Sequence, residues 1–394
     1  MEIKSAAPIL EPLSHSAKQA RLLFIDNIRW ILIALVICHH AAVTYSHVGG
    51  WYYFDGPQPP PLTTIAFATF ETLNQAYFMG ILFLLAGYFV PRAFATKGFL
   101  KFSRDRFIRL GVPVLFFMLV IHPFVVYWLL RKFDDPAIPT LARAYLPFLT
   151  SGRVLGATGP MWFALALLIF CLVYGVIRLA VNKRSAAITP LPGHKEVMEL
   201  MLLMGACSFL VRITQPIGKS IENMQLAYFS QYILLFIVGI LAYRGDWLLR
   251  IPYSFGMFWF KLALWIGVPA CPLIILTSGV LHGNSRSLLG GVHWQSAVFC
   301  VWEAFFCVAV CLGLIVLFRE KFNRQTAFSG WMSQNSFSAY LFHTPLLVAV
   351  TLCLKQIDAG PALKFALATL VAVPLTFAVS GLIRTRIPGL SRLL

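Results

Sequence analysis

Long uninterrupted apolar runs constrain this chain more than any other feature of its sequence. The chain has 394 residues, of which 59% are hydrophobic and 12% charged, and its mean hydropathy is +0.77. A water-soluble globule could not bury this much apolar surface, so the lipid bilayer must be its solvent. About 20 apolar residues make one helical crossing of the hydrocarbon core. Because the runs are continuous rather than alternating, they favour an all-α, polytopic transmembrane helical bundle over a β-barrel.

Ten runs are long enough to cross, and we therefore predict about ten transmembrane helices. They lie near residues 28–48, 65–90, 110–130, 160–181, 197–215, 226–243, 257–280, 295–318, 331–354 and 362–384. We expect a cytoplasmic N-terminal segment over residues 1–25, one transmembrane domain over 26–386 and a cytoplasmic tail over 387–394. No small-residue cleavage site follows an apolar core at the start of the chain. The first helix is therefore expected to act as its own insertion signal.

The distribution of positive charge predicts the orientation. The formal net charge is +17, but the Lys and Arg residues occupy short segments between apolar runs, which is typical of membrane topology rather than of nucleic-acid binding. Alternate segments are rich in these residues: Lys18 and Arg21; Arg92, Lys97, Lys101, Arg104, Arg106 and Arg109; Lys183, Arg184 and Lys195; Arg244 and Arg250; Arg319, Lys321 and Arg324; and Arg384, Arg386 and Arg392. The opposite segments are poorer, except for 131–158. Since positive loops stay in the cytoplasm, we predict a multi-pass protein of the bacterial inner membrane with both termini cytoplasmic.

Several common chemistries lack their sequence signatures. The eight cysteines all fall in apolar runs and are expected to be small buried residues, not disulfides or zinc ligands. The chain has no His-Glu-x-x-His ligand set, no Gly-flanked serine elbow and no phosphate-binding loop. We therefore predict no metal, and the pattern argues against a hydrolase, a zinc enzyme or a nucleotide-driven pump.

Ionisable residues in the first apolar run are the main candidates for chemistry. Asp26, Arg29, His39 and His40 lie in or beside this run, and such groups are costly in a membrane unless they are used or paired. His40 stands about 18 Å beyond the inner boundary, toward the outer half. An imidazole titrates near neutrality and can act as a general base for a hydroxyl nucleophile. The alternative is a structural histidine; because adjacent residues point in different directions, only one of the pair is expected to face a site, and the sequence leaves open whether His39 supports or replaces His40.

Four sequence blocks, in order, resemble the acyltransferase-3 family of integral membrane acyltransferases. The blocks are the run from Asp26 to His40, FMGILFLLAGYFV, KFSRDRFIRLGVP and SQNSFSAYLFHTPLL. By its spacing of eleven positions from Arg29, His40 rather than His39 matches the family histidine, and the resemblance implies that Arg29 and His40 are functionally required. Other positions that match the family pattern are Arg106, Arg109, Ser336, Tyr340 and His343, whereas Ala86 stands where serine is common. The segment GPMWFA around Trp162 and the closing LFHTPLL are similar to the branch that includes glucan-modifying succinyltransferases.

The basic stretch after the second run suits a phosphate-bearing donor. Acyl-coenzyme A carries several phosphate charges, which Arg104, Arg106 and Arg109 could clamp through bidentate hydrogen bonds. Arg106 and Arg109 lie three apart at the start of a helix and would share one face. The alternative is that these arginines only set the orientation and contact anionic lipid headgroups.

Two carboxylates inside apolar runs are further candidates, Glu71 and Glu303. Either could orient an imidazole, share a proton with it or pair with a buried arginine. We expect Glu71 to be the catalytic partner of His40 because both fall toward the outer half, with Glu303 as second choice and structural pairing as the alternative for each. Trp162, Glu303, Tyr340 and His343 are predicted to bind substrate, and His343 to line the same cavity. His122, beside Pro123, is interpreted as structural.

These patterns and the resemblance predict a membrane O-acyltransferase. It would move an acetyl or succinyl group from acyl-coenzyme A to a hydroxyl of a glycan or other envelope acceptor, with His40 as general base. Transfer in one step and transfer through an acylated side chain both fit. The rival is a transporter or flippase that uses the same buried charges; a sensor or assembly subunit would leave the His40 and Arg106 pattern unexplained. The expected partners are the lipid bilayer, acyl-coenzyme A and the acceptor, with no nucleic acid, and the oligomeric state stays open.

Overall fold

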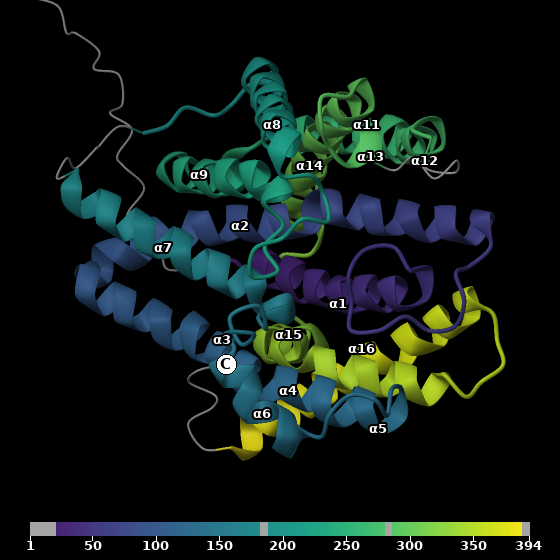
Figure 1. Ribbon diagram of the computed structural model, residues 1–394. Coiled ribbons are helices and arrows are strands. Elements are labelled where there is room, and N and C mark those ends of the chain that lie inside the picture. The colour runs from purple at the N-terminus through teal and green to yellow at the C-terminus, as the bar shows by residue number, and fades with distance from the viewer. Residues whose placement is uncertain (1–20, 182–187, 280–285, 388–394) are drawn as a thin grey trace, which may run out of the picture.

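The computed structural model describes residues 21–181, 188–279 and 286–387 and is shown in Figure 1. Over these ranges the regular structure is helical and contains no strand, only an isolated β-bridge between Ile221 and Met224. The predicted all-α class is therefore confirmed. Most of the predicted terminal tails and the loop pair Lys183 and Arg184 lie outside the described residues.

Nine segments within the described ranges are long and apolar enough to cross a membrane. They are α1 (Leu23–Ser46), the run Pro61–Phe133, η5 with α7 (Gly159–Ala180), α8 (His194–Thr214), η6 with α9 (Leu226–Gly245), α11 to α12 (Tyr253–Thr277), α14 (Trp294–Lys321), α15 (Ala327–Leu354) and α16 (Pro361–Arg386). Short helices connect them: α6 (Leu141–Thr150), α10 (Trp247–Arg250) and α13 (Arg286–Leu289). The protein is thus a multi-pass integral membrane protein.

The count is nine rather than ten because two predicted spans belong to one helical run. Pro61–Phe133 has 73 residues, and a straight helix of that length would measure roughly 110 Å, more than three times the hydrocarbon thickness. The run bends within α2 (Pro61–Arg106) at Gly98, whose φ of 69° and ψ of 171° are not helical. A positive φ is accessible to glycine because it has no Cβ. The bend separates the predicted spans at 65–90 and 110–130.

The second half of this run accommodates prolines through wider turns. The π-helical segments Phe107–Gly111, Phe117–Ile121 and Val125–Leu130 alternate with α3 (Val112–Phe116), α4 (His122–Phe124) and α5 (Arg131–Phe133). Pro113 and Pro123 lie in the first turns of α3 and α4. A proline has no N–H to donate to the carbonyl four residues earlier in an α-helix. The wider π turns beside these prolines change the hydrogen-bond spacing locally from four residues to five.

Helix α1 lies between two apolar cores. One of its faces contributes Phe24, Ile28 and Leu32 to a cluster formed with α2, α8, α9 and α14. The other contributes Ile37 and Tyr45 to a cluster formed with the second half of the long run, α15 and α16. Figure 1 shows this arrangement, with α1 between α2 and the pair α15 and α16. Among the eight cysteines, expected to be buried, five are buried and Cys353 is exposed.

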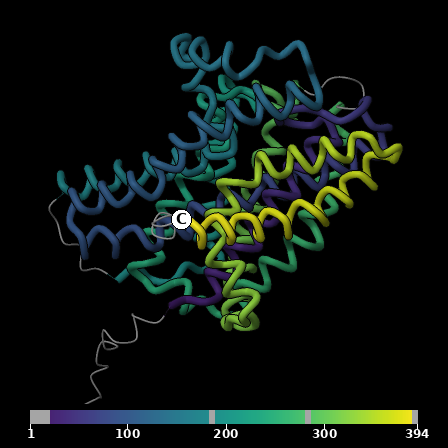
Figure 2. Tube along the Cα trace, turned by 90° about the horizontal axis from the view of Figure 1, so that it is seen from below, coloured from purple at the N-terminus to yellow at the C-terminus, as the bar shows by residue number. Residues whose placement is uncertain are grey.

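Hydrogen bonds from the first turns of two helices to loops mark the two ends of the bundle. At one end, the Asn27 amide in α1 donates to the Phe322 and Arg324 carbonyls at 2.7 and 2.9 Å. At the other end, Lys364 at the start of α16 pairs with Asp55 of the loop 47–60 at 2.8 Å. Figure 2 shows the two yellow helices, α15 and α16, running side by side along the bundle. The predicted basic segments at the start of α1 and after α14 therefore meet at one end, which we call the basic end.

Candidate active site

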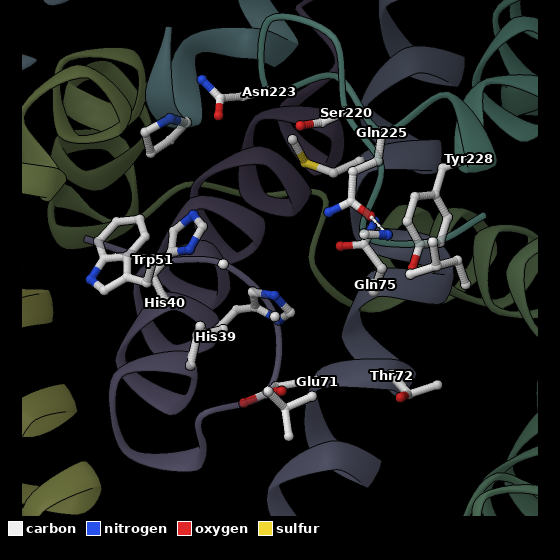
Figure 3. A pocket seen from close by; sticks show the side chains of 18 of the residues that line it. His39, His40, Trp51, Glu71, Thr72, Gln75, Ser220, Asn223, Gln225 and Tyr228 are labelled. Carbon is white, nitrogen blue, oxygen red and sulfur yellow. Dashed lines mark hydrogen bonds between the residues drawn. The ribbon is translucent and has the colours of Figure 1, made fainter. Parts of the chain in front are cut away.

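A cavity of about 1000 Å³ opens at the end opposite the basic end. Five elements form its walls: the last turns of α1, the loop 47–60, the first half of α2, the segment 156–162 and the loop 217–228, with α14 closing one side. Figure 3 shows His40 and Trp51 together on one side, Gln225 and Tyr228 on the opposite side, and Glu71 with Thr72 below. Among the residues predicted for the site, the cavity brings together His40, Glu71, Trp162, Glu303 and Tyr340.

His40 lies among aromatic rings at the cavity wall. Its imidazole stacks on the indole of Trp51, with centroids 4.1 Å apart and planes 15° apart. The ring of His343 lies on the same imidazole at 5.4 Å and 13°. His39 also lines the cavity, against Phe78 at 5.2 Å. The expectation that only one of the adjacent histidines would face the site is therefore wrong, because the cavity extends around the end of α1.

His343 lies behind His40 rather than in the cavity lining. Its side chain is fully buried, and its Nδ1 lies 2.7 Å from the Tyr340 carbonyl oxygen. Because a carbonyl oxygen only accepts hydrogen bonds, Nδ1 carries a proton. The other ring nitrogen, Nε2, is buried and has no hydrogen-bond partner among the described residues. The Tyr340 hydroxyl donates to the Pro160 carbonyl and so ties α15 to the segment that carries Trp162.

Glu71 shares the cavity with His40 but hydrogen-bonds to another residue. Its carboxylate accepts a hydrogen bond from the Ser46 hydroxyl at 2.7 Å, and Ser46 in turn accepts one from the Val48 N–H at 3.0 Å. This chain of bonds fixes the end of α1 and the start of the loop that carries Trp51. Glu71 was expected to partner His40; the structure places it in the same cavity and gives it a contact with Ser46.

Glu303 forms a buried ion pair with Arg212. The two side chains are 3% and 0% exposed, and Arg212 Nη2 lies 2.6 Å from a carboxylate oxygen of Glu303. The guanidinium also donates to the Ala227 carbonyl and lies over the rings of Tyr228 and Phe299 at 5.0 and 5.4 Å. Pairing with a buried arginine was one of the alternatives for Glu303. Its specific partner was missed, although a single arginine inside the apolar run 197–215 was a signal, since such a charge needs a counter-ion.

His122 also lies at the cavity wall. His122 was interpreted as structural, but it lines the cavity, and its Nδ1 lies 3.1 Å from the hydroxyl of Tyr52. Burial raises the pKa of Tyr52, so this hydroxyl keeps its proton at neutral pH and can donate to the imidazole. The pair joins the loop 47–60 to the second half of the long helical run.

Four predicted arginines lie outside the cavity: Arg29, which was expected to be catalytic, and Arg104, Arg106 and Arg109, which were expected to bind the donor. Arg29 faces Asp26 at 3.6 Å and covers the ring of Phe89 at 5.0 Å. Arg106 lies over the ring of Phe102 at 5.2 Å, whereas Arg104 and Arg109 are exposed. None of the four contributes to the described cavity lining. Arg29 precedes His40 by eleven residues of one helix, which separates them by roughly 16 Å along its axis.

Comparison with known protein families identifies the family to which this chain belongs. Residues 22–384 match the acyltransferase domain of family 3, a stretch that contains both the basic end and the cavity. The chain belongs to the acyltransferase-3 family. It is therefore a membrane-bound acyltransferase, and the expectation of an enzyme is confirmed. Searches of curated proteins and of solved structures found no match to this acyltransferase.

Proposed function

We propose that the enzyme transfers an acetyl or succinyl group from acyl-coenzyme A to a hydroxyl of a glycan or other envelope acceptor, with His40 as general base. The observation that carries this proposal is the position of His40, which lines a cavity of about 1000 Å³ and stacks on Trp51. The cavity has room for a sugar unit beside the imidazole, and drug-sized ligands occupy pockets of roughly 300 to 1,000 Å³.

The chemistry of the lining supports a carbohydrate acceptor. The indoles of Trp51 and Trp162 and the ring of Tyr228 offer flat apolar faces, while the amides of Gln75 and Asn223 offer donors and acceptors. Sugars present both kinds of surface, C–H faces for the rings and hydroxyls for the amides. Trp162 then contacts the acceptor directly, and Tyr340 is a positioning residue that holds the segment 159–162 through Pro160.

The donor is proposed to bind from the basic end. Guanidinium groups form bidentate hydrogen bonds with phosphates, and Arg29, Arg104, Arg106 and Arg109 supply four of them near the start of α1 and the end of α2. By the positive-inside rule this end faces the cytoplasm of a bacterial inner membrane, where acyl-coenzyme A is made, and both termini are then cytoplasmic. Helix α1 connects the donor arginines to His40.

The proposed reaction is a one-step transfer. A ring nitrogen of His40 takes the proton of the acceptor hydroxyl while the hydroxyl oxygen bonds to the thioester carbonyl carbon. The carbon–sulfur bond breaks, the sulfur leaves as coenzyme A and receives a proton, and the ester stays on the acceptor. Glu71, whose side chain lies in the same cavity, is proposed to share a proton with the imidazole. The site also accelerates the reaction by holding donor and acceptor in one orientation, in addition to the action of the base.

Acyl transfer into envelope glycans tests the proposal. Inverted membrane vesicles from cells expressing the protein are supplied with labelled acetyl- or succinyl-coenzyme A, and label in glycan is counted. We expect His40→Ala to lower incorporation about 10²- to 10⁴-fold at equal protein level, the usual contribution of a general base. His293→Ala is the matched control, because His293 is exposed and absent from the cavity lining. Movement of an acceptor across the membrane without acylation would instead support the transporter reading.

A further inference from the structure

The loop 47–60 brings an aromatic side chain onto the candidate general base. Its Trp51 stacks on His40 with ring centroids 4.1 Å apart (Figure 3). The loop has no regular secondary structure. In the described structure, one backbone hydrogen bond joins residues 49–58 to another element, from the Asp55 N–H to a carbonyl in the last turn of α1 at 2.9 Å. Because so few backbone bonds hold this loop, side-chain contacts must set its position.

A buried ion pair joins this loop to α16. Asp55 is the only Asp, Glu, Lys or Arg of the loop, and its carboxylate lies 2.8 Å from Nζ of Lys364. The two side chains are only 3% and 11% exposed, so water screens their attraction little. The ammonium also lies 3.5 Å from the Lys355 carbonyl oxygen at the end of α15. The pair therefore links the loop to the connection between α15 and α16.

Lys364 occupies a position where a lysine is unfavourable. It lies in α16 one turn after the N-cap Gly360, and the free N–H groups at a helix start repel a cation. Burial adds the cost of dehydrating the ammonium. Apolar residues in place of a buried ion pair are often as stable or more stable, and in some proteins such pairs instead specify one arrangement of the chain. The location of this pair therefore favours a role in positioning over a role in stability.

We propose that Asp55 and Lys364 are positioning residues for acyl transfer, which hold the loop 47–60 so that Trp51 stays on the ring of His40. Neither of the paired side chains lines the cavity, so they act through the loop and not on the substrate. A misplacement of about 1 Å can lower an enzymatic rate about 100-fold. This inference rests on the proposed function, in which His40 is the general base.

Breaking the pair should loosen the loop and slow acyl transfer. A nitroxide spin label at Gln58→Cys, in a Cys353→Ser background, reports the mobility of the loop by electron paramagnetic resonance; both positions are exposed. We expect Lys364→Met to sharpen the spectrum of this label. In the unlabelled protein, Lys364→Met should lower kcat about 10- to 100-fold and leave the KM for acyl-coenzyme A unchanged, because the donor is proposed to bind at the basic end.

Three further variants separate positioning from stability. Lys355→Met is the matched control, because it breaks the neighbouring pair with Asp134 at 2.5 Å, whose aspartate lies outside the loop; loop mobility and transfer should not change. The double variant Asp55→Leu with Lys364→Met leaves no charge unpaired, so its unfolding midpoint should stay near that of the wild type while transfer stays low. The exchanged pair, Asp55→Lys with Lys364→Asp, should recover most of the transfer.

The outcomes separate this inference from the proposed function. An unchanged spin-label spectrum in Lys364→Met, or wild-type transfer in the apolar double variant, would overturn the positioning role and leave His40 as general base. A mobile loop combined with wild-type transfer would overturn it as well. Absence of His40-dependent acyl transfer by the wild type would overturn the proposed function, and the inference with it.

Discussion

Removing the arginine of the buried ion pair should strongly destabilise the fold. Arg212 and Glu303 are almost fully buried and 2.6 Å apart, and the rings of Tyr228 and Phe299 cover the guanidinium. Arg212→Met keeps the volume but leaves the Glu303 carboxylate without its counter-ion. Loss of one partner of a buried pair costs about 3 to 5 kcal/mol, and loss of the cation–π contacts adds to this.

A double-mutant cycle in detergent micelles measures this coupling. Thermal or denaturant unfolding is followed for the wild type, Arg212→Met, Glu303→Met and the double variant. We expect each single variant to be strongly destabilised and the double variant to recover much of the loss, because no uncompensated charge then remains buried. The coupling energy between the two sites is expected to be several kcal/mol.

Near-additive effects would refute this reasoning. If Arg212→Met lost less than about 1 kcal/mol, the pair would behave like an exposed one, for which double-mutant cycles give about 0.2 to 1 kcal/mol. Ser208→Ala on the same face of α8 is a control, because Ser208 is buried and carries no charge.

Three further predictions address the ring contact at His40, the donor arginines and a close helix crossing. Trp51→Ala should lower kcat/KM about tenfold or more, and Trp51→Phe much less, because the flat face on the His40 ring is lost only in the first variant; acyl transfer at equal protein level tests this. Arg106→Ala should raise the KM for acyl-coenzyme A about tenfold and leave that for the acceptor unchanged, since a charge-assisted hydrogen bond contributes about 1.5 to 3 kcal/mol; an equal rise in both would contradict a role in donor binding. Gly239→Ala should destabilise the fold by about 1 to 3 kcal/mol, because its Cβ would lie 2.1 Å from the Leu84 carbonyl oxygen, whereas Gly50→Ala, with nothing within 4 Å, should not; unfolding midpoints compare the two.

Much of the fold could be predicted because a bilayer leaves few choices. A run of about 20 apolar residues must be helical, since lipid offers no partner for a free backbone group. The helices at 28–48, 295–318 and 331–354 accordingly correspond to α1, α14 and α15. The joining of 65–90 and 110–130 was missed because the polar stretch between them has helical propensity and only Gly98 leaves the helix.

The relative positions of site residues could be predicted only for residues that lie on the same helix. The order of Arg29 and His40 along α1 fixes their separation, so their placement at different depths follows from the sequence. Contacts between distant segments do not: Glu303 and Arg212 are 91 positions apart, and their pairing depends on how α8 packs on α14. The burial of His343 behind His40 and the contact of Tyr52 with His122 depend on packing in the same way.

Single-turnover acyl transfer by His40→Gln protein tests the central claim most directly. Purified wild type and variant in lipid nanodiscs are loaded with labelled acetyl-coenzyme A, and donor binding and label in envelope glycan are measured on the same samples. The account predicts unchanged donor binding and a transfer rate lowered at least about 100-fold, because glutamine keeps hydrogen bonding but cannot take the proton. Transfer within a few-fold of the wild-type rate would contradict His40 as the general base.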